Sequence, residues 1–218
     1  MPGGRRRAAR SSRPPSELQI EVLVEEPSAE IALGKIMPKI VDGRARFEIR
    51  NLESKFKLLG KLKDRLLAYR DRIDKGENLD ILVFVDRDSD DCEELMRKME
   101  RLARDAGLRT KTASGGEDFR VVNRIVIEEL ESWFLGDPDA LRAAFPKLPA
   151  LNPRKDPFRN PDNGGSWETL DRLLRKHGVY GSRYPKIEGA QRIAPHLDPE
   201  RNRSASFRAF RQGVESLL

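Results

Sequence analysis

Short apolar segments alternate with amphipathic ones along the first 135 residues of the chain. Residues 18–24 alternate apolar and polar side chains before becoming fully apolar, residues 44–50 alternate throughout, and residues 81–85 are apolar at every position. Alternation is typical of a strand with one buried face, whereas an unbroken apolar run is typical of a strand buried on both faces. Residues 109–112 and 121–127 are the remaining strand candidates.

Between these segments, apolar residues recur at every third or fourth position, as on one face of a helix. We expect a first helix with Ser28 as its N-cap, a second over residues 59–73, and a third over residues 93–106 that ends at Gly107. The apolar face of the first helix comprises Ile31, Leu33, Ile36, Met37 and Ile40. Strands that alternate with helices predict an α/β domain with a mostly parallel sheet flanked by helices.

The composition changes near residue 146, where a segment rich in Pro, Asn, Asp and Gly predicts a long loop to residue 165. Helices are expected over residues 167–177, 187–196 and 207–218. The last helix carries an apolar face made of Phe207, Phe210, Val214 and Leu217. We therefore expect three parts: a disordered basic tail (residues 1–16), an α/β domain (residues 17–150) and a helical C-terminal extension (residues 151–218).

The net charge of +6 suggests a basic protein, but most of this excess comes from the N-terminal tail. The first sixteen residues hold no acid and contain Arg5, Arg6, Arg7, Arg10 and Arg13. Without these five arginines, 37 basic residues face 36 acidic ones, so the rest of the chain is nearly neutral. Any contact with nucleic acid must then come from local basic patches.

The single cysteine, Cys92, excludes an internal disulfide and a cysteine-based zinc site. No apolar stretch approaches the about 20 residues that a membrane span needs, and no apolar run follows the basic N-terminus as it does in a secretory signal. These features are typical of a protein of the reducing cytoplasm.

Four carboxylates follow the apolar run at residues 81–85, and they are Asp86, Asp88, Asp90 and Asp91. In an extended chain Asp86 and Asp88 project from the same side, where they repel each other unless a proton or a cation lies between them. Carboxylate oxygens are hard ligands that suit Mg²⁺, Mn²⁺ or Ca²⁺. Open parallel sheets bind their ligands at the C-terminal ends of the strands, which is where these residues are expected.

Glu25 follows the first predicted strand just as Asp86 and Asp88 follow the third. Because the C-terminal ends of parallel strands lie at one edge, we expect Glu25, Asp86 and Asp88 to form a magnesium or manganese site, with Asp90 as a further ligand. Glu128 and Glu131 are three residues apart and could reach the same edge from one helix face. Alternatively, both belong to the surface of that helix.

Residues 86–91 have three other interpretations. A calcium-binding EF-hand loop needs Gly at the sixth position and Glu at the twelfth, where this chain has Asp91 and Arg97, so that loop is excluded. A phosphatase of the haloacid-dehalogenase type also uses Asp-x-Asp after a buried strand, but it leaves Glu25 without a role. Finally, acids near a helix start can simply cap the helix, which accounts better for Asp90 and Asp91 than for the first two.

Glu after the first strand and Asp-x-Asp after a later one resemble the layout of Toprim domains, which serve topoisomerases, primases and nucleases related to overcoming-lysogenization-defect proteins. Longer stretches of the chain resemble the bacterial domain-of-unknown-function family 4276, a Toprim-like group. These stretches are residues 22–30, 85–92, 128–137, 186–190 and 202–210. Two positions depart from the relatives: Glu26 replaces the Gly of Toprim domains, and Lys55 alone remains where Gly-Lys is expected.

The resemblance implies a Toprim-like fold and a Mg²⁺-dependent phosphodiester hydrolase, a nuclease acting on DNA or RNA. Glu25, Asp86 and Asp88 would then be catalytic, with Glu25 as general acid or base through a water. The basic helix face would supply phosphate contacts through Lys55, Lys57 and Lys61. The alternative is a non-catalytic Toprim-fold subunit that binds or regulates an ATPase encoded nearby, in anti-phage defence; the chain has no Walker motif of its own.

Overall fold

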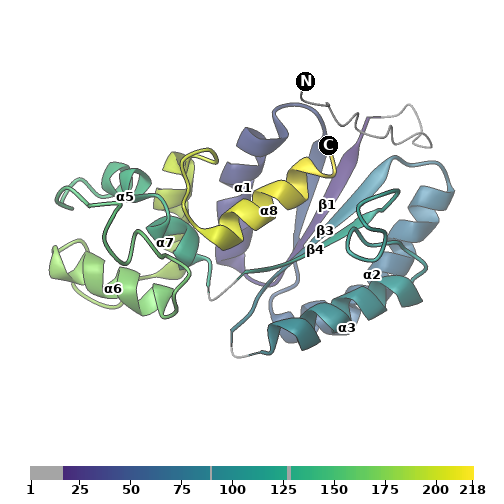
Figure 1. The fold of residues 1–218 in the computed structure, drawn as a ribbon, viewed down its shortest axis with the longest axis horizontal. Coiled ribbons are helices and arrows are strands. Elements are labelled where there is room, and N and C mark those ends of the chain that lie inside the picture. Colours follow the sequence, from purple (N-terminus) through teal and green to yellow (C-terminus); the bar gives the residue numbers. More distant parts are fainter. Residues whose placement is uncertain (1–16, 89, 127–128) are drawn as a thin grey trace, which may run out of the picture.

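A parallel four-stranded sheet forms the centre of the computed structural model, which describes residues 17–88, 90–126 and 129–218 (Figure 1). Its strands are β1 (Gln19–Val24), β2 (Arg46–Asn51), β3 (Leu79–Asp86) and β4 (Val121–Val126), and they lie in the order β2-β1-β3-β4. All three strand pairs are parallel. The α/β class and the parallel sheet predicted from the sequence are confirmed.

Strand β3 lies between β1 and β4 and is buried at all eight of its positions. This double burial explains its continuous apolar run, since helices cover both faces of the sheet. The alternating pattern of β2 likewise fits its place at the edge of the sheet, where exposed and half-buried positions alternate along most of its length.

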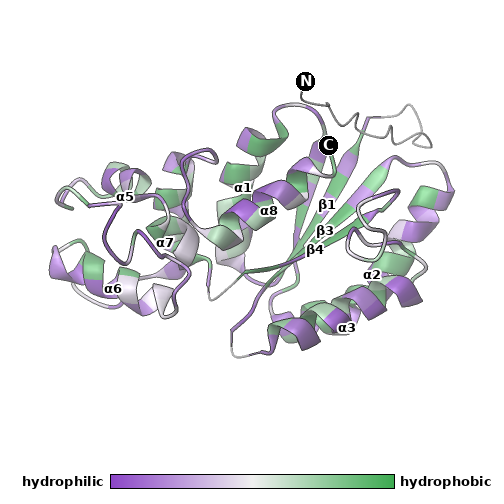
Figure 2. Cartoon of the chain, viewed as in Figure 1, coloured by the Kyte–Doolittle hydropathy of each residue, from purple (hydrophilic) through white to green (hydrophobic). Residues whose placement is uncertain are grey.

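Helix α1 (Pro27–Val41) covers one face of the sheet, and helices α2 (Lys55–Asp74) and α3 (Cys92–Asp105) cover the other (Figure 1). One apolar cluster joins α1 to Ile20, Val22 and Phe84, whereas a second joins α2 and α3 to residues such as Val83. Figure 2 shows the hydrophobic residues concentrated in the strands and on the inner sides of these helices.

Five further helices follow β4 in the described part of the chain. They are α4 (Glu131–Leu135), α5 (Pro138–Ala144), α6 (Ser166–Lys176), α7 (Lys186–Ile193) and α8 (Ala205–Glu215), and a 3₁₀ turn (Ala194–His196) follows α7. Helix α8 lies against β4 on the same side of the sheet as α1, while α5, α6 and α7 gather beyond the C-terminal ends of the strands (Figure 1). The predicted helical C-terminal part is therefore present.

An aromatic cluster joins α8 to the sheet. Phe84 of β3 packs edge-on against Trp133 of α4 and Phe210 of α8, with ring centroids 5.2 and 5.4 Å apart. Phe207 packs edge-on against Trp133, with ring centroids 5.0 Å apart. Apolar residues from both sides of position 150, the expected boundary, thus belong to one continuous core.

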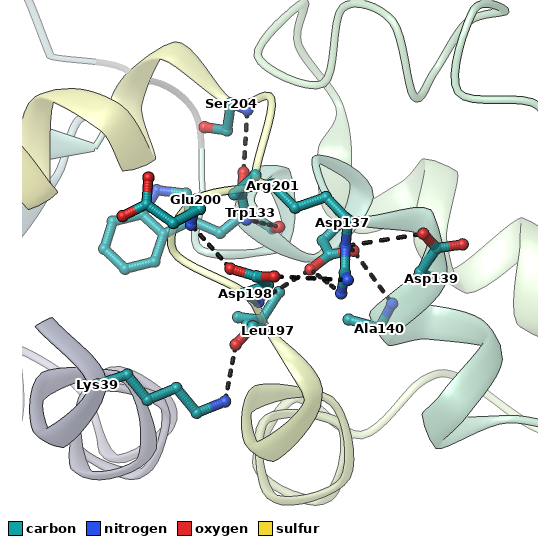
Figure 3. A network of polar contacts seen from close by, with 11 residues as sticks. Lys39, Trp133, Asp137, Asp139, Ala140, Leu197, Asp198, Glu200, Arg201 and Ser204 are labelled. Atoms are coloured by element: carbon teal, nitrogen blue, oxygen red, sulfur yellow. Dashed lines mark hydrogen bonds and ion pairs between the residues drawn. The ribbon is translucent and has the colours of Figure 1, made fainter.

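A polar network fixes the loop before α8 to the α4–α5 junction (Figure 3). Asp137 is fully buried and accepts two hydrogen bonds from the guanidinium of Arg201, at 2.8 and 3.0 Å. The side chain of Asn202 donates to the carbonyl of Trp133 at 2.8 Å. A side chain at Gly136 would lie 2.4 Å from the Asn202 oxygen, so glycine is required where these segments approach. Two stretches that carry the family resemblance, residues 128–137 and 202–210, therefore contact each other.

Three details differ from the sequence predictions. Glu26, not Ser28, is the N-cap of α1, and the hydroxyl of Ser28 donates to the Glu26 carboxylate. Residues 109–112 form only an isolated bridge between Thr110 and Val121, because the chain turns directly afterwards. In α2, Leu58 is fully buried, whereas Leu59 is only partly buried.

Residues 1–16, predicted to be a disordered tail, lie outside the described residues. Within the part of the chain that is described, no helix is both long and apolar enough to cross a membrane.

Candidate functional site

The candidate site lies where the chain connections leave the sheet in opposite directions. The connection after β1 leads through α1 to β2 on one side, and the connection after β3 leads through α3 to β4 on the other. Such a switch point opens a crevice at the C-terminal ends of the two strands, where open α/β sheets bind their ligands. Five carboxylates follow β1 or lie at the end of β3, and we call this group the acidic edge: Glu25, Glu26, Asp86, Asp88 and Asp90.

Glu25 and Asp86 form the buried centre of the acidic edge. The backbone N–H of Asp86 donates to the Glu25 carboxylate, and the two residues are only 7% and 6% exposed. Burial raises the pKa of Glu25 to about 7, against the opposing effects of that hydrogen bond and of the Lys55 charge. Burial, with the negative charges of Glu26 and Glu25, raises the pKa of Asp86 well above its usual range. Burial therefore favours the protonated form of both carboxyl groups relative to exposed ones.

Lys55, at the start of α2, occupies the outer side of the acidic edge. Its Nζ lies 2.6 Å from Asp88 Oδ2 and 2.9 Å from Asp90 Oδ2, and it also donates to the carbonyl of Arg87 at 3.1 Å. Burial lowers the pKa of Lys55, but the hydrogen bonds with Asp88 and Asp90 outweigh it and raise that pKa overall. Asp88 adopts a left-handed backbone conformation with φ of 50°, which is uncommon for a residue other than glycine.

A second polar group reaches the acidic edge from the C-terminal helices. Glu131 of α4 is 1% exposed, and among the described residues neither of its carboxylate oxygens has a hydrogen-bond partner. Burial raises the pKa of Glu131 to about 7, although the charge of Lys186 opposes this shift. Glu131 in turn contributes to the raised pKa of Asp86, so the two carboxylates interact.

Lys186 and Tyr184 complete this second group. The Nζ of Lys186 lies 3.3 Å from Glu129 Oε1, and although burial lowers its pKa, the charges of Glu131, Glu26 and Glu129 raise it overall. The buried hydroxyl of Tyr184 has no hydrogen-bond partner within the described part of the chain. A side chain at Gly189 would lie 2.0 Å from that hydroxyl, which explains the glycine of Lys186-Ile-Glu-Gly-Ala. This motif belongs to the stretches that carry the family resemblance, but nothing in the sequence pattern indicates that Lys186 or Tyr184 approaches the site.

The structure brings some of the predicted site residues together, but not all of them. Glu25, Asp86, Asp88 and Asp90 lie at one edge as expected, and the charge of Glu131 contributes to the raised pKa of Asp86. Glu128 lies outside the described residues. Of the other predicted lysines of α2, Lys57 forms an ion pair with Glu53, and Lys61 is exposed.

The described side chains of the acidic edge are not grouped closely enough to surround a metal ion. Within residues 17–88, 90–126 and 129–218, no three Asp, Glu, His or Cys side chains are grouped so as to hold a metal ion. Instead, the ammonium group of Lys55 lies between Asp88 and Asp90. The expected magnesium or manganese site thus remains a prediction.

Glu131→Gln should change how stability depends on pH. With a pKa raised from 4.5 to about 7, Glu131 holds a proton in the native protein that the unfolded chain has lost. The free energy of unfolding should therefore fall as the pH rises from about 4.5 to about 7. The variant should match the wild type near the lower pH and should be more stable above the higher one. Thermal melts in EDTA measure this, with the exposed Glu168→Gln as control; parallel curves for wild type and Glu131→Gln would contradict it.

Comparison with known proteins identifies a family. No curated protein and no solved structure matches the chain. One family matches residues 24–215, a range that runs from the end of β1 to the end of α8 and includes every described residue of the acidic edge and the second polar group. The chain therefore belongs to the family described as Domain of unknown function (DUF4276).

Proposed function

We propose that this protein is a Mg²⁺- or Mn²⁺-dependent phosphodiester hydrolase that acts on nucleic acid through a Toprim-like site. The observation that carries the proposal is the burial of Glu25 and Asp86 together at the switch point of the sheet, where the backbone N–H of Asp86 donates to the Glu25 carboxylate. Burying two nearby carboxyl groups costs free energy unless a proton or a ligand compensates for it. A pair placed where α/β sheets bind ligands is therefore better explained by function than by stability.

The residues present suit a divalent cation chemically. Glu25, Asp86 and Asp88 would hold it, with Asp90 as a further ligand, and all of them offer the hard oxygen atoms that Mg²⁺ and Mn²⁺ prefer. When bound, the cation would neutralise charge on the scissile phosphate and activate a water. The Lys55 ammonium already binds Asp88 and Asp90, which supports a preference of these acids for positive charge.

The side chains of the acidic edge can also move protons and position a phosphate. A carboxyl with a pKa of about 7, such as that of Glu25, can accept or donate a proton near neutral pH, which suits a general base or acid. Lys55, which contacts Asp88 and Asp90, would be within reach of a phosphate bound at the same edge. Burial of Glu25 and Asp86 limits the access of bulk water and strengthens these interactions.

An exposed aromatic side chain beside the site favours nucleic acid over a small phosphate ester. Phe56 follows Lys55 directly and is 87% exposed. Packing does not account for this exposure, whereas unpaired bases stack on such side chains in proteins that bind single strands. Lys57 and Lys61 extend from the same end of α2 and would contact the phosphate backbone.

A second candidate is a non-catalytic subunit that binds or regulates an ATPase partner. The ion pairs between Lys55 and both Asp88 and Asp90 favour it, because they compensate part of the negative charge without a metal. Glu26, in the place of the glycine of Toprim domains, adds a further negative charge near the phosphate position. Such a protein would retain the acidic edge and cleave nothing.

Metal-dependent stability and cleavage should be measured together. Thermal melts in Mg²⁺, Mn²⁺ and EDTA test cation binding, since a ligand that binds only the native protein raises the melting temperature by mass action. Labelled single- and double-stranded DNA and RNA then test hydrolysis under the same conditions. Both a metal-dependent stabilisation and metal-dependent cleavage are expected. Stabilisation without cleavage of any substrate would favour the subunit, and the absence of both would reject the metal site.

A further inference from the structure

Helix α8 begins at the same end of the sheet as the acidic edge. The side chain of Arg124, within β4, donates to the carbonyl of Ala209 at 2.8 Å, whereas Trp133, beyond the C-terminal end of β4, donates to Ser206 at 3.0 Å. Residues nearer the start of α8 thus contact residues farther along the chain from β4. The helix therefore runs antiparallel to the strand, and its first residues lie beyond the strand's C-terminal end (Figure 1).

A basic surface pocket lies at this end of α8, with a volume of about 310 Å³. We call it the arginine pocket, and its polar lining consists of Arg159, Arg203, Arg208, Asn160, Asp162 and Asn163. Asp162 is its single acid, and that carboxylate is already occupied: it accepts hydrogen bonds from the Ser204 hydroxyl and from the backbone N–H of Ala205, both at 2.7 Å. The Asp162 carboxylate thus stabilises the N-terminus of α8.

Two of the three arginines have no acidic partner among the described residues. Arg203 and Arg208 form no ion pair with a carboxylate within the described part of the chain, and their hydrogen bonds go to the carbonyls of Pro153 and Arg203, respectively. Arg159 is paired with Asp156, and both side chains are mostly exposed. Guanidinium groups bind phosphate oxygens through two parallel hydrogen bonds, so two of them at one pocket suit this anion.

We propose that the arginine pocket binds a backbone phosphate of a nucleic-acid strand whose scissile bond lies at the acidic edge. The inference rests on the proposed function for the identity of the ligand. Its place in the fold supports the assignment, because β4 is the neighbour of β3 and the pocket lies beyond the C-terminal end of β4. The amide group of Asn163 adds hydrogen-bonding capacity without sequence-specific reading of bases, whereas that of Asn160 already donates to Asp156 at 2.8 Å.

The test uses a double substitution and a matched control. Arg203→Gln/Arg208→Gln removes two positive charges from the pocket. Arg101→Gln/Arg104→Gln removes two exposed charges from α3, on the opposite face of the sheet, where neither arginine has a carboxylate partner among the described residues. Fluorescence anisotropy of labelled DNA and RNA oligonucleotides is measured in EDTA at several salt concentrations, so that binding is separated from hydrolysis.

The pocket variant should bind more weakly at each salt concentration, and the slope of log K against log[salt] should fall by roughly 1 to 2. The control should change both quantities much less, and Arg203→Lys/Arg208→Lys should restore most of the slope. Equal losses in the pocket variant and the control would overturn the proposal. So would loss of stabilisation by inorganic phosphate with unchanged oligonucleotide binding, since the pocket would then serve free phosphate.

This test is independent of the proposed hydrolysis. The wild type and Asp86→Asn should give the same salt slope in EDTA, since the substitution does not alter the arginine pocket. A protein that binds nucleic acid through the pocket but never cleaves it would leave this inference standing and reject the hydrolase. Cleavage with unchanged KM in Arg203→Gln/Arg208→Gln would reject this inference and leave the proposed hydrolase standing.

Discussion

Asp86→Asn should reduce metal-dependent cleavage of nucleic acid on the order of a hundredfold or more, while raising the melting temperature of the metal-free protein. The substitution removes one negative charge with almost no change in shape. Asp86 is buried beside Glu25, and its raised pKa reflects the cost of keeping that charge out of water. Removing the charge relieves the repulsion in the metal-free protein and removes a ligand from the proposed metal site.

The informative comparison is the melting temperature with and without Mg²⁺ for three proteins: wild type, Asp86→Asn, and Asp105→Asn as a control. Asp105 is exposed at the end of α3, on the surface, and its substitution should leave stability, metal response and cleavage unchanged. The metal-induced increase should be present in the wild type and the control and be much smaller in Asp86→Asn. Equal increases in all three proteins would exclude Asp86 as a ligand.

The sequence was sufficient to predict the sheet and its acidic edge. The apolar run of residues 81–85 predicts a doubly buried strand, and the parallel arrangement that follows from alternating strands and helices places Glu25 and Asp86 at one edge. Neither step needs long-range information. The first depends on the period of the side chains, and the second on the geometry that every parallel sheet shares.

The surroundings of the acidic edge could not be predicted in the same way. The contacts of Lys55 with Asp88 and Asp90 cross between different connections of the sheet, so no local period indicates them. The approach of Lys186 and Tyr184 depends on how the C-terminal helices pack against β4 and α1, which the sequence pattern leaves undetermined. Ser28 and Glu26 illustrate the same limit over two residues, because either is a plausible cap until the course of the chain is known.

Helix α8 packs against the sheet through an aromatic cluster, and Phe210→Ala should show how much this packing contributes to stability. The side chain is 1% exposed and contacts the rings of Phe84 and Trp133, with centroids 5.4 and 4.8 Å apart. Removing a buried phenylalanine typically costs about 3 to 5 kcal/mol, from lost burial and from the cavity that remains. For a chain of this length, the melting temperature should fall by roughly 10 °C.

Phe56→Ala provides the matched control, since it makes the same substitution at a side chain that is 87% exposed. It should leave the melting temperature nearly unchanged, while Phe210→Ala lowers it sharply and retains a metal-induced increase if the protein still folds. Equal melting temperatures for the two variants would mean that α8 contributes little to stability. In that case the arginine pocket, formed partly by the first turn of α8, would also lack the rigid support that binding a phosphate requires.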